Sequence, residues 1–314
     1  MKALLNSDPP VVTVLEIHDP TAIGETMEWL DQEVVQLDSE ALRFRRVIVR
    51  LQAAQVMFQS TNRPGRSHTR LKDGCVAVVA FGPRAIGTLN GLAVGPDRLL
   101  ASPSGVDVEF VVAAGYESVT FFLSEAQHAW FSLAGVQLLQ TRDGAARQLY
   151  GWGRRLADQA ARNPDLFEMP LARSVVEEEL LDTLRTVLQS TDLHETTAQD
   201  RTRQEHSRVV QIAQAYAVTH LGERVPVVDM GEAAGVSERT LQYAFKEMLG
   251  MSPVAYLNRL RLHRVRLALR AASWESTTVT QEALRWGFWH VGDFSQAYKK
   301  CFGESPSETL RRQP

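Results

Sequence analysis

The chain has 314 residues, of which 34 are Lys or Arg and 37 are Asp or Glu, so its formal net charge is −3. Hydrophobic residues make up 44% and charged residues 23%, values typical of globular proteins that exclude a wholly disordered or fibrous chain. The length favours two domains, and no apolar run reaches the ~18 residues that a membrane span needs. With only Cys75 and Cys301, the sequence predicts no disulfide framework and a cytoplasmic location.

The charges are unevenly distributed along the chain. Residues 201–314 hold 16 basic and 11 acidic side chains, net +5, whereas residues 1–200 hold 18 and 26, net −8. A basic segment can be the footprint of a polyanion. The imbalance indicates two parts with different roles.

Residues 32–123 have the pattern of a β-rich domain. Asn90-Gly91 is typical of a type I′ hairpin, in which both central residues need positive φ. Apolar strands rich in Val and Phe are predicted at residues 75–81, 99–101, 106–113 and 118–123. Their spacing of about 8–12 residues predicts a sandwich or barrel, here a cupin-like or jelly-roll barrel with flanking helices.

Helical patterns follow, over residues 124–190. One helix is expected at 124–133 and another at 146–163, ended by Pro164. Ser174 and Glu177 form a capping-box pattern, which predicts a further helix start. An apolar stripe at helical spacing comes next, namely Val176, Leu180, Leu184, Val187 and Leu188. This stripe would pack against the β-rich part or against a second copy of the chain.

A polar segment ends the N-terminal domain, which is placed at residues 1–195. Residues 196–207 are almost free of large apolar side chains and are interpreted as an exposed linker, either mobile or helical. The C-terminal domain, residues 208–314, contains two copies of one pattern. Each copy has a short helix, a glycine turn and a second helix with an outward polar face, which is the helix-turn-helix layout.

The two helix-turn-helix units span residues 227–248 and 280–302. In the first unit Gly235 supplies the turn and Ser237 the N-cap of the second helix. A helix over residues 253–270, roughly 27 Å long, would connect the units as a strut with two apolar faces. Such a strut could set the two second helices about one DNA turn (~34 Å) apart.

The C-terminal ~105 residues, about 208–312, resemble the AraC/XylS family of transcription regulators. The resemblance rests on the strings AAGVSERTL (233–241), GMSPVAYL (250–257), RLHRVR (261–266), and WGFWH (286–290) continuing to FGESP (302–306). It implies an all-α DNA-binding domain and an N-terminal domain for effector binding and dimerisation. The whole chain is similar to the branch that includes ethanolamine-operon regulators.

DNA contacts are predicted from side-chain chemistry on the second helices. Arg pairs with guanine O6 and N7, and Gln pairs with adenine N6 and N7, so Arg239 and Gln242 are the first candidates. Lys side chains favour phosphates. Gln296 and Asp293 depart from the family, whose second unit often has Arg at the first position and a basic or neutral residue at the second. The second unit would therefore read bases more weakly, or read different ones. The DNA candidates are Glu238, Arg239, Gln242, Tyr243, Lys246, His290, Val291, Asp293, Ser295, Gln296 and Lys299, and the phosphate candidates are Ser237, Arg259, Arg266 and Arg270.

The stripe formed by Arg259, Arg266 and Arg270 has two further interpretations, a solvated face and a contact between domains. For the N-terminal domain a sensor is favoured over an enzyme. No cluster of His and carboxylate ligands, GxSxG motif, P-loop or dinucleotide fingerprint occurs, so no catalytic site, metal or cofactor is expected. Effector contacts are considered for Arg63, Arg66, Arg70, Phe110, Phe121 and Trp130.

The sequence thus predicts a transcription regulator, with an activator favoured over a repressor. Its expected partners are double-stranded promoter DNA, RNA polymerase, a small-molecule effector and a second copy of the chain, without a membrane. Control by a partner protein instead of an effector is the alternative. A metal-dependent cupin-type enzyme fused to a DNA-binding domain is more remote. The expected DNA site has about 17–20 base pairs, and the expected place is the bacterial nucleoid.

Overall fold

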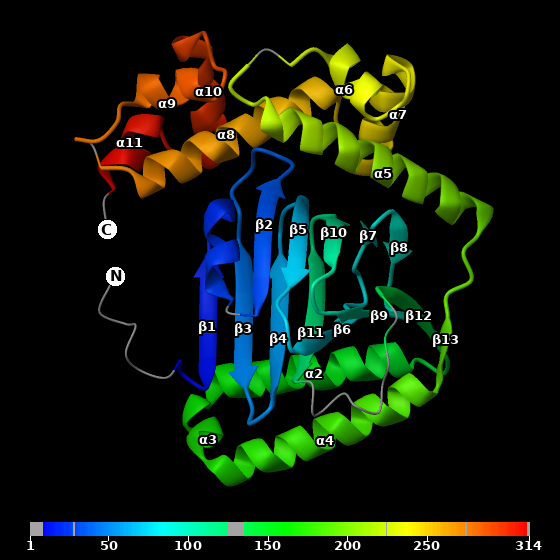
Figure 1. Ribbon diagram of the computed structural model, residues 1–314. Helices are drawn as coiled ribbons and strands as arrows, with labels where there is room; N and C mark the ends of the chain where they lie inside the picture. The colour runs from blue at the N-terminus through cyan, green and yellow to red at the C-terminus, as the bar shows by residue number, and fades with distance from the viewer. Residues whose placement is uncertain are drawn as a thin grey trace.

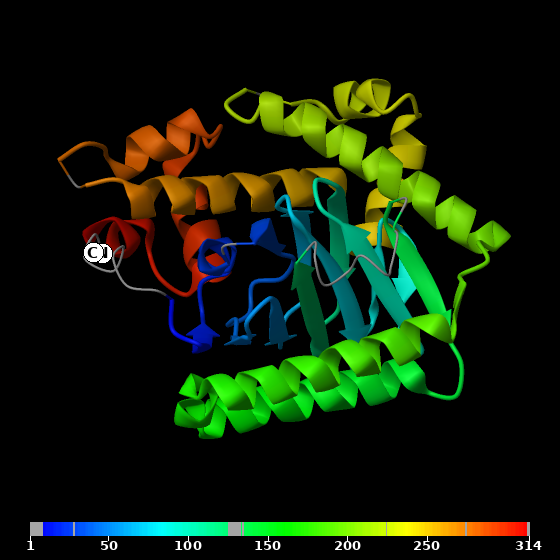
Figure 2. The same ribbon diagram turned by 60° about the horizontal axis from the view of Figure 1, so that its bottom comes forward.

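The computed structural model describes residues 9–27, 29–124, 133, 135–223, 225–273 and 275–312. Helices within residues 145–189 lie along one side, the β-sheets form the middle, and the C-terminal helices lie along the other side (Figures 1 and 2). A β-rich N-terminal part and an all-helical C-terminal part are therefore present, as predicted. Trp130 and most of the predicted helix at 124–133 lie outside the described residues.

The larger sheet has eight strands in the order β1-β3-β4-β11-β6-β9-β12-β13. Neighbouring strands are antiparallel throughout. The strands are β1 (Val12–Ile17), β3 (Phe44–Arg50), β4 (Ala54–Thr61), β6 (Cys75–Phe81), β9 (Arg98–Pro103), β11 (Tyr116–Ser124), β12 (Gln137–Thr141) and β13 (Thr191–Leu193).

The smaller sheet has five strands in the order β2-β5-β10-β7-β8. They are β2 (Leu30–Gln36), β5 (Gly65–Leu71), β7 (Gly87–Leu89), β8 (Leu92–Val94) and β10 (Asp107–Val112). The predicted hairpin at Asn90-Gly91 joins β7 to β8, and both residues have positive φ, 45° and 84°.

The predicted cupin-like or jelly-roll barrel is not confirmed. Among the described strands β1 pairs with β3 alone and β2 with β5 alone, so both remain edge strands and neither sheet closes. The two sheets instead face each other as an open sandwich, since side chains from both of them line one internal cavity.

Helices α2 (Ala145–Arg162), α3 (Pro164–Glu168) and α4 (Pro170–Gln189) cover the outer face of the larger sheet (Figure 2). Their buried faces share one core with the sheet, in which Leu180, Leu184 and Phe121 have no exposed surface. The apolar stripe of α4 therefore packs within the N-terminal domain, which is one of its two predicted roles. Phe121 is consequently not a candidate for effector binding, because strand alternation points its side chain toward α2 and away from the cavity.

The predicted helix start at Ser174 is wrong. Pro170 begins α4 one turn earlier, because its fixed φ suits the first helical position. The Glu177 carboxylate caps no helix in this arrangement. It accepts hydrogen bonds from the backbone N–H groups of Gln52 (2.7 Å) and Ala53 (3.0 Å), and so anchors α4 to the β3–β4 turn.

The C-terminal domain consists of helices in two lobes joined by α8. The helices are α5 (Ala198–Thr219), α6 (Val227–Ala233), α7 (Glu238–Leu249), α8 (Pro253–Ala271), α9 (Val279–Arg285), α10 (Val291–Phe302) and α11 (Pro306–Arg311). The first lobe contains α5, α6, α7 and the start of α8, and the second contains the rest of α8 with α9, α10 and α11.

Residues 196–207, interpreted as an exposed linker that is either mobile or helical, are mostly the first half of α5, and more than half of them are exposed. Thr197 caps this helix, because its hydroxyl accepts from the Asp200 N–H and the Asp200 carboxylate accepts from the Thr197 N–H. The polar sequence is explained by the surroundings: Ser207 is buried against polar groups of the sheet, and the hairpin turn at Gly91 touches the backbone of Arg203. Only four residues, 194–197, separate β13 from α5.

No helix within the described residues is long and apolar enough to cross a membrane.

Two glycines of α2, Gly151 and Gly153, can be substituted to test how closely this helix packs on the larger sheet. A Cβ at Gly153 would lie 2.5 Å from Val119 Cγ1 and 2.9 Å from Phe121 Cζ, so Gly153→Ala should destabilise the fold by about 1–3 kcal/mol. At Gly151 a Cβ would meet only the flexible end of Arg155, so Gly151→Ala should stabilise by ~0.5–1 kcal/mol. Urea unfolding of both variants measures the difference, and equal effects would contradict the packing.

Candidate nucleic-acid interface

The first helix-turn-helix unit is built by α6 and α7. Gly235 lies between them with φ +68°, and Ser237 caps α7 by accepting from the Thr240 N–H at 3.2 Å. Leu241 and Phe245 are fully buried, which fixes the rotation of α7 on its lobe. The opposite side of α7 is therefore presented outward.

The second unit is built by α9 and α10. Gly287, with φ +82°, forms the turn, and a Cβ there would lie 2.8 Å from the Leu221 carbonyl oxygen, so the position also needs a residue without a side chain. Phe294 and Tyr298 are buried on the inner side of α10. The predicted bounds of α10, residues 291–302, match the structure.

Helix α8 connects the units as the predicted strut. Ser252 caps it and Pro253 is its first residue. Leu257 and Leu260 belong to the core of the first lobe, whereas Val265 and Leu269 belong to that of the second. Helix α8 thus fixes α7 and α10, the second helices of the two units, in relation to each other. The second helix of a helix-turn-helix unit is called its recognition helix.

Most of the predicted DNA residues are exposed on α7 and α10. Tyr243 has 61% of its surface exposed and its ring lies 5.4 Å from that of His206 in α5. Gln242, Val291 and Ser295 are half-buried, and the Ser295 hydroxyl donates to the Val291 carbonyl at 2.9 Å. The exposed members are Glu238, Arg239, Tyr243, Lys246, His290, Asp293, Gln296 and Lys299, together with the cap residue Ser237.

One exposed side chain beside α10 was missed by sequence reasoning. Trp289, directly before the N-cap His290, keeps 63% of its surface exposed. Its position could have indicated this exposure, because Trp289 lies in the turn before α10 and so is not part of the periodic pattern of buried side chains in that helix.

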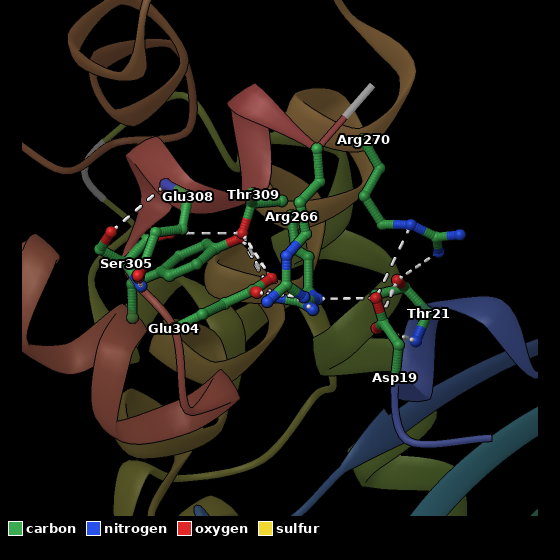
Figure 3. A network of polar contacts seen from close by, with 10 residues as sticks. Asp19, Thr21, Arg266, Arg270, Glu304, Ser305, Glu308 and Thr309 are labelled. Atoms are coloured by element: carbon green, nitrogen blue, oxygen red, sulfur yellow. Dashed lines mark hydrogen bonds and ion pairs between the residues drawn. The ribbon is translucent and has the colours of Figure 1, made fainter. Parts of the chain in front are cut away.

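The three arginines of α8 that were predicted to contact phosphates, Arg259, Arg266 and Arg270, do not lie with the DNA candidates. Figure 3 shows Arg266 and Arg270 pointing at Asp19, which precedes the short helix η1 (Pro20–Ala22) of the N-terminal domain. Arg266 Nε lies 2.9 Å from Asp19 Oδ2, and Arg266 Nη2 lies 3.0 Å from Glu304 Oε1. Arg270 donates to the Thr21 hydroxyl at 2.9 Å. Their assignment as phosphate contacts is replaced by a contact between domains.

The contact between the domains continues along α8 and α5. Arg259 donates to the Ser39 hydroxyl at 3.0 Å, and Arg264 pairs with Glu33 at 2.9 Å. Arg264, which sequence reasoning did not select, thus also contacts the N-terminal domain. We call this set of contacts the domain interface.

The centre of the domain interface is Arg66 on β5, which is buried. Its Nη1 donates to the Tyr256 hydroxyl of α8 at 2.8 Å, and its Nη2 pairs with the Glu109 carboxylate of β10. The Ser207 hydroxyl of α5 donates to the same carboxylate at 3.3 Å. Apolar contact accompanies these bonds, since Val35 of β2 is buried in the core of the first lobe.

Burial and charge shift the titration of two groups at the domain interface. Burial works against ionisation of Asp19, but the positive charge of Arg266 and the hydrogen bonds from Thr21 outweigh it and hold its pKa below the usual value. Burial raises the pKa of Tyr256 to about 12, so its hydroxyl stays protonated at neutral pH. At the domain interface Asp19 is therefore ionised and Tyr256 is neutral near pH 7.

The smaller sheet separates the domain interface from an internal cavity of about 110 Å³. In β5, Ser67 and Thr69 line the cavity, whereas Arg66 turns its guanidinium to α8. In β10, Phe110 lines the cavity and Glu109 faces α5. Because successive strand residues point to opposite faces, one sheet forms the cavity wall and the docking surface. We call it the partition sheet.

The remaining effector candidates have different environments. Arg63 and Phe110 line the cavity, and Arg63 also pairs with Asp38 at 3.4 Å. Arg70 is exposed and pairs with Asp107 at 3.3 Å, outside the cavity. The structure therefore brings together two of the six candidates, with Arg66 at the boundary. Within the described ranges no group of three or more His, Cys, Asp or Glu side chains could hold a metal ion.

Two helix-turn-helix units on one strut define a DNA-binding domain, and comparison with known proteins gives its family. Residues 230–312 match the family model described as a helix-turn-helix domain. The chain is 41% identical over 106 residues to a probable thc operon regulatory protein of Rhodococcus erythropolis, covering 34% of this chain and 32% of that protein. It is 33% identical over 105 residues to the XylDLEGF operon transcriptional activator of Pseudomonas putida, covering 33% and 32%.

A solved structure of a probable AraC family transcriptional regulator from Rhodopseudomonas palustris is 34% identical, covering 34% of this chain and 98% of that one with a TM-score of 0.31. The C-terminal domain is thus a helix-turn-helix domain similar to those of AraC/XylS-type transcription regulators. The chain spans about a third of the length of the two curated relatives. The closer likeness to ethanolamine-operon regulators stays a prediction.

Substitutions of Arg266 and of Arg312, which both pair with Glu304, test the contribution of the buried ion pairs at the domain interface. Arg266 is 8% exposed, so Arg266→Met leaves the carboxylates of Asp19 and Glu304 without this partner and should cost about 3–5 kcal/mol. Arg312 pairs with the same Glu304 but is 75% exposed, so Arg312→Met should cost at most ~1 kcal/mol. Urea unfolding measures both, and similar losses would show that burial of the cluster contributes nothing.

Proposed function

We propose that the protein is a sequence-specific transcription regulator, more specifically an activator, which binds promoter DNA through α7 and α10. The observation that carries this proposal is the exposure of polar faces on both recognition helices while their other faces are locked into lobes that share α8. An α-helix presented in this way fits the major groove of B-DNA.

Within this proposal the side chains have different roles. Arg239 and Gln242 are assigned to base edges, because their donor and acceptor patterns match guanine and adenine. Lys246 and Lys299 are assigned to phosphates. His290, Asp293 and Gln296 would face the second half-site. Its weaker or different base preference follows from replacing an arginine by Gln296.

We further propose that a small molecule in the N-terminal domain controls this binding. The support is the partition sheet, because a displacement of its strands by a ligand in the cavity would also move the side chains of Glu33 and Arg66 that hold α8. A ligand shifts such an equilibrium only if it favours one arrangement. The four-residue connection to α5 limits how far the DNA-binding domain can travel. Dimerisation and contact with RNA polymerase complete the proposed mode of action.

Substitutions on α7 test the DNA-binding proposal in the full-length protein. Arg239→Ala and Gln242→Ala should each weaken binding to the target promoter by roughly 1–3 kcal/mol and relax base preference at one position. Lys246→Ala should weaken binding to all sequences alike, because phosphate contacts carry no sequence information. Fluorescence anisotropy on wild-type and base-substituted operators measures both effects.

Arg142→Ala is the control for this series, because Arg142 is an exposed arginine of the N-terminal domain that pairs with Asp192. Its DNA affinity should equal that of the wild type. If the Arg239→Ala, Gln242→Ala double variant keeps both the wild-type affinity and the wild-type base preference, α7 is not the helix that contacts the bases.

The link between the partition sheet and α8 is tested by Tyr256→Phe. This change removes the hydroxyl that accepts from Arg66 and keeps the buried ring, so docking should weaken by about 1.5–3 kcal/mol, as for other hydrogen bonds to charged groups. Hydrogen exchange of β5 and α8 amides should accelerate.

Tyr150→Phe removes a hydroxyl that donates to Glu117 inside the N-terminal domain, and serves as the matched control. Its faster exchange should be confined to α2 and β11. If Tyr256→Phe leaves exchange in β5 and α8 at the wild-type rate, the hydrogen bond does not hold the domains together.

A further inference from the structure

The cavity between the two sheets has a composition that restricts the charge of any molecule bound in it. Its described lining contains no Asp, Glu, Lys or His side chain. Two arginines contribute to the lining, and each already has a carboxylate partner outside the cavity, Asp38 for Arg63 and Glu109 for Arg66. A charged ligand would have to break one of these pairs or lie unpaired in an apolar space, and both are costly.

Most polar groups of the lining are engaged within the protein. The carbonyl oxygen of Gln32 accepts a hydrogen bond from Arg46 at 2.9 Å, and its amide donates one to the Thr69 hydroxyl at 3.3 Å. Gln59 likewise accepts from Arg46 at 3.2 Å and donates to the Ser118 hydroxyl at 3.3 Å. These glutamines therefore cover the buried guanidinium of Arg46 on the cavity side.

Two hydroxyl groups of the lining make no hydrogen bond within the described part of the chain, those of Ser67 and Thr120. Ser67 belongs to β5 of the partition sheet, and Thr120 belongs to β11 of the larger sheet. A bound molecule could use one or both of them. More than half of the lining residues are apolar, with Phe44, Phe110 and Phe122 among them.

We infer that the cavity binds a neutral, largely apolar molecule about the size of one six-membered ring with a short polar substituent. The cavity of about 110 Å³ approaches the roughly 150 Å³ of an engineered cavity that takes up benzene. The substituent hydrogen-bonds the Ser67 or Thr120 hydroxyl, and the ring packs on the aromatic side chains. This inference rests on the proposed control by a small molecule and names the chemical class of that molecule.

Three probes of similar shape and different charge test the inference on the full-length protein. They are benzamide, benzoate and benzylamine, each measured by saturation-transfer NMR and isothermal titration calorimetry. Benzamide should bind at least about tenfold more tightly than either charged probe, since neither charge finds a free partner. Tighter binding of benzoate would overturn the chemical class and leave control by a small molecule intact.

Substitutions on β5 and β11 locate the binding site. Ser67→Leu fills the cavity and should abolish benzamide binding, whereas His68→Leu changes the next side chain, which faces away from the cavity, and should retain it. Thr120→Val preserves shape and removes one hydroxyl, so it should weaken benzamide binding and leave that of toluene unchanged. It provides an independent test if Ser67→Leu fails to fold.

If both Ser67→Leu and Thr120→Val bind benzamide with wild-type affinity, the cavity is not the binding site. If no probe binds at millimolar concentration, the inference as a whole is overturned. DNA binding of the same samples is measured in parallel. Loss of DNA recognition would count against the proposed function, whereas intact recognition without probe binding counts against the ligand alone.

Discussion

The alternation of side chains along the partition sheet is the constraint on which the arrangement of both domains depends. A β-strand sends successive residues to opposite faces, so the side chains of Ser67 and Arg66 point in opposite directions. One neighbour lines a cavity and the other holds Tyr256 of the DNA-binding domain. A shift of one residue in the register of β5 would exchange these roles, so pairing with β2 and β10 fixes both surfaces at once.

The unequal charge of the two parts of the chain has a second explanation in this arrangement. A net charge of +5 on residues 201–314 agrees with a DNA-binding role, yet four arginines of α8 face the N-terminal domain, Arg259, Arg264, Arg266 and Arg270. The acidic part supplies Asp19, Glu25 and Glu33 opposite them. Part of the asymmetry therefore serves docking between domains, because without these four arginines the net charge of residues 201–314 falls from +5 to +1.

Local signals in the sequence were sufficient for the helix-turn-helix units and insufficient for the surfaces between domains. Gly235, Ser237 and the bounds of α10 were predicted because turns, caps and helical periodicity depend on neighbouring residues. The N-terminal partners of the α8 arginines are more than 200 positions away, and no local pattern identifies them. The same reason explains Glu177, whose spacing from Ser174 mimics a capping box although its carboxylate binds the β3–β4 turn.

The polar composition of residues 196–207 shows why polarity alone cannot decide between a mobile and a helical segment. A helix packed on apolar surface must carry an apolar stripe, but the surface under this part of α5 offers the Glu109 carboxylate and the hairpin turn at Gly91. Ser207 suits the Glu109 carboxylate because its hydroxyl donates a hydrogen bond to it. The turn at Gly91 requires only that the backbone of α5 can approach it closely, which the absence of a side chain on Gly91 permits. The domain boundary therefore lies in the four residues between β13 and α5. Any signal from the cavity reaches the recognition helices through the partition sheet, through that short connection, or through both.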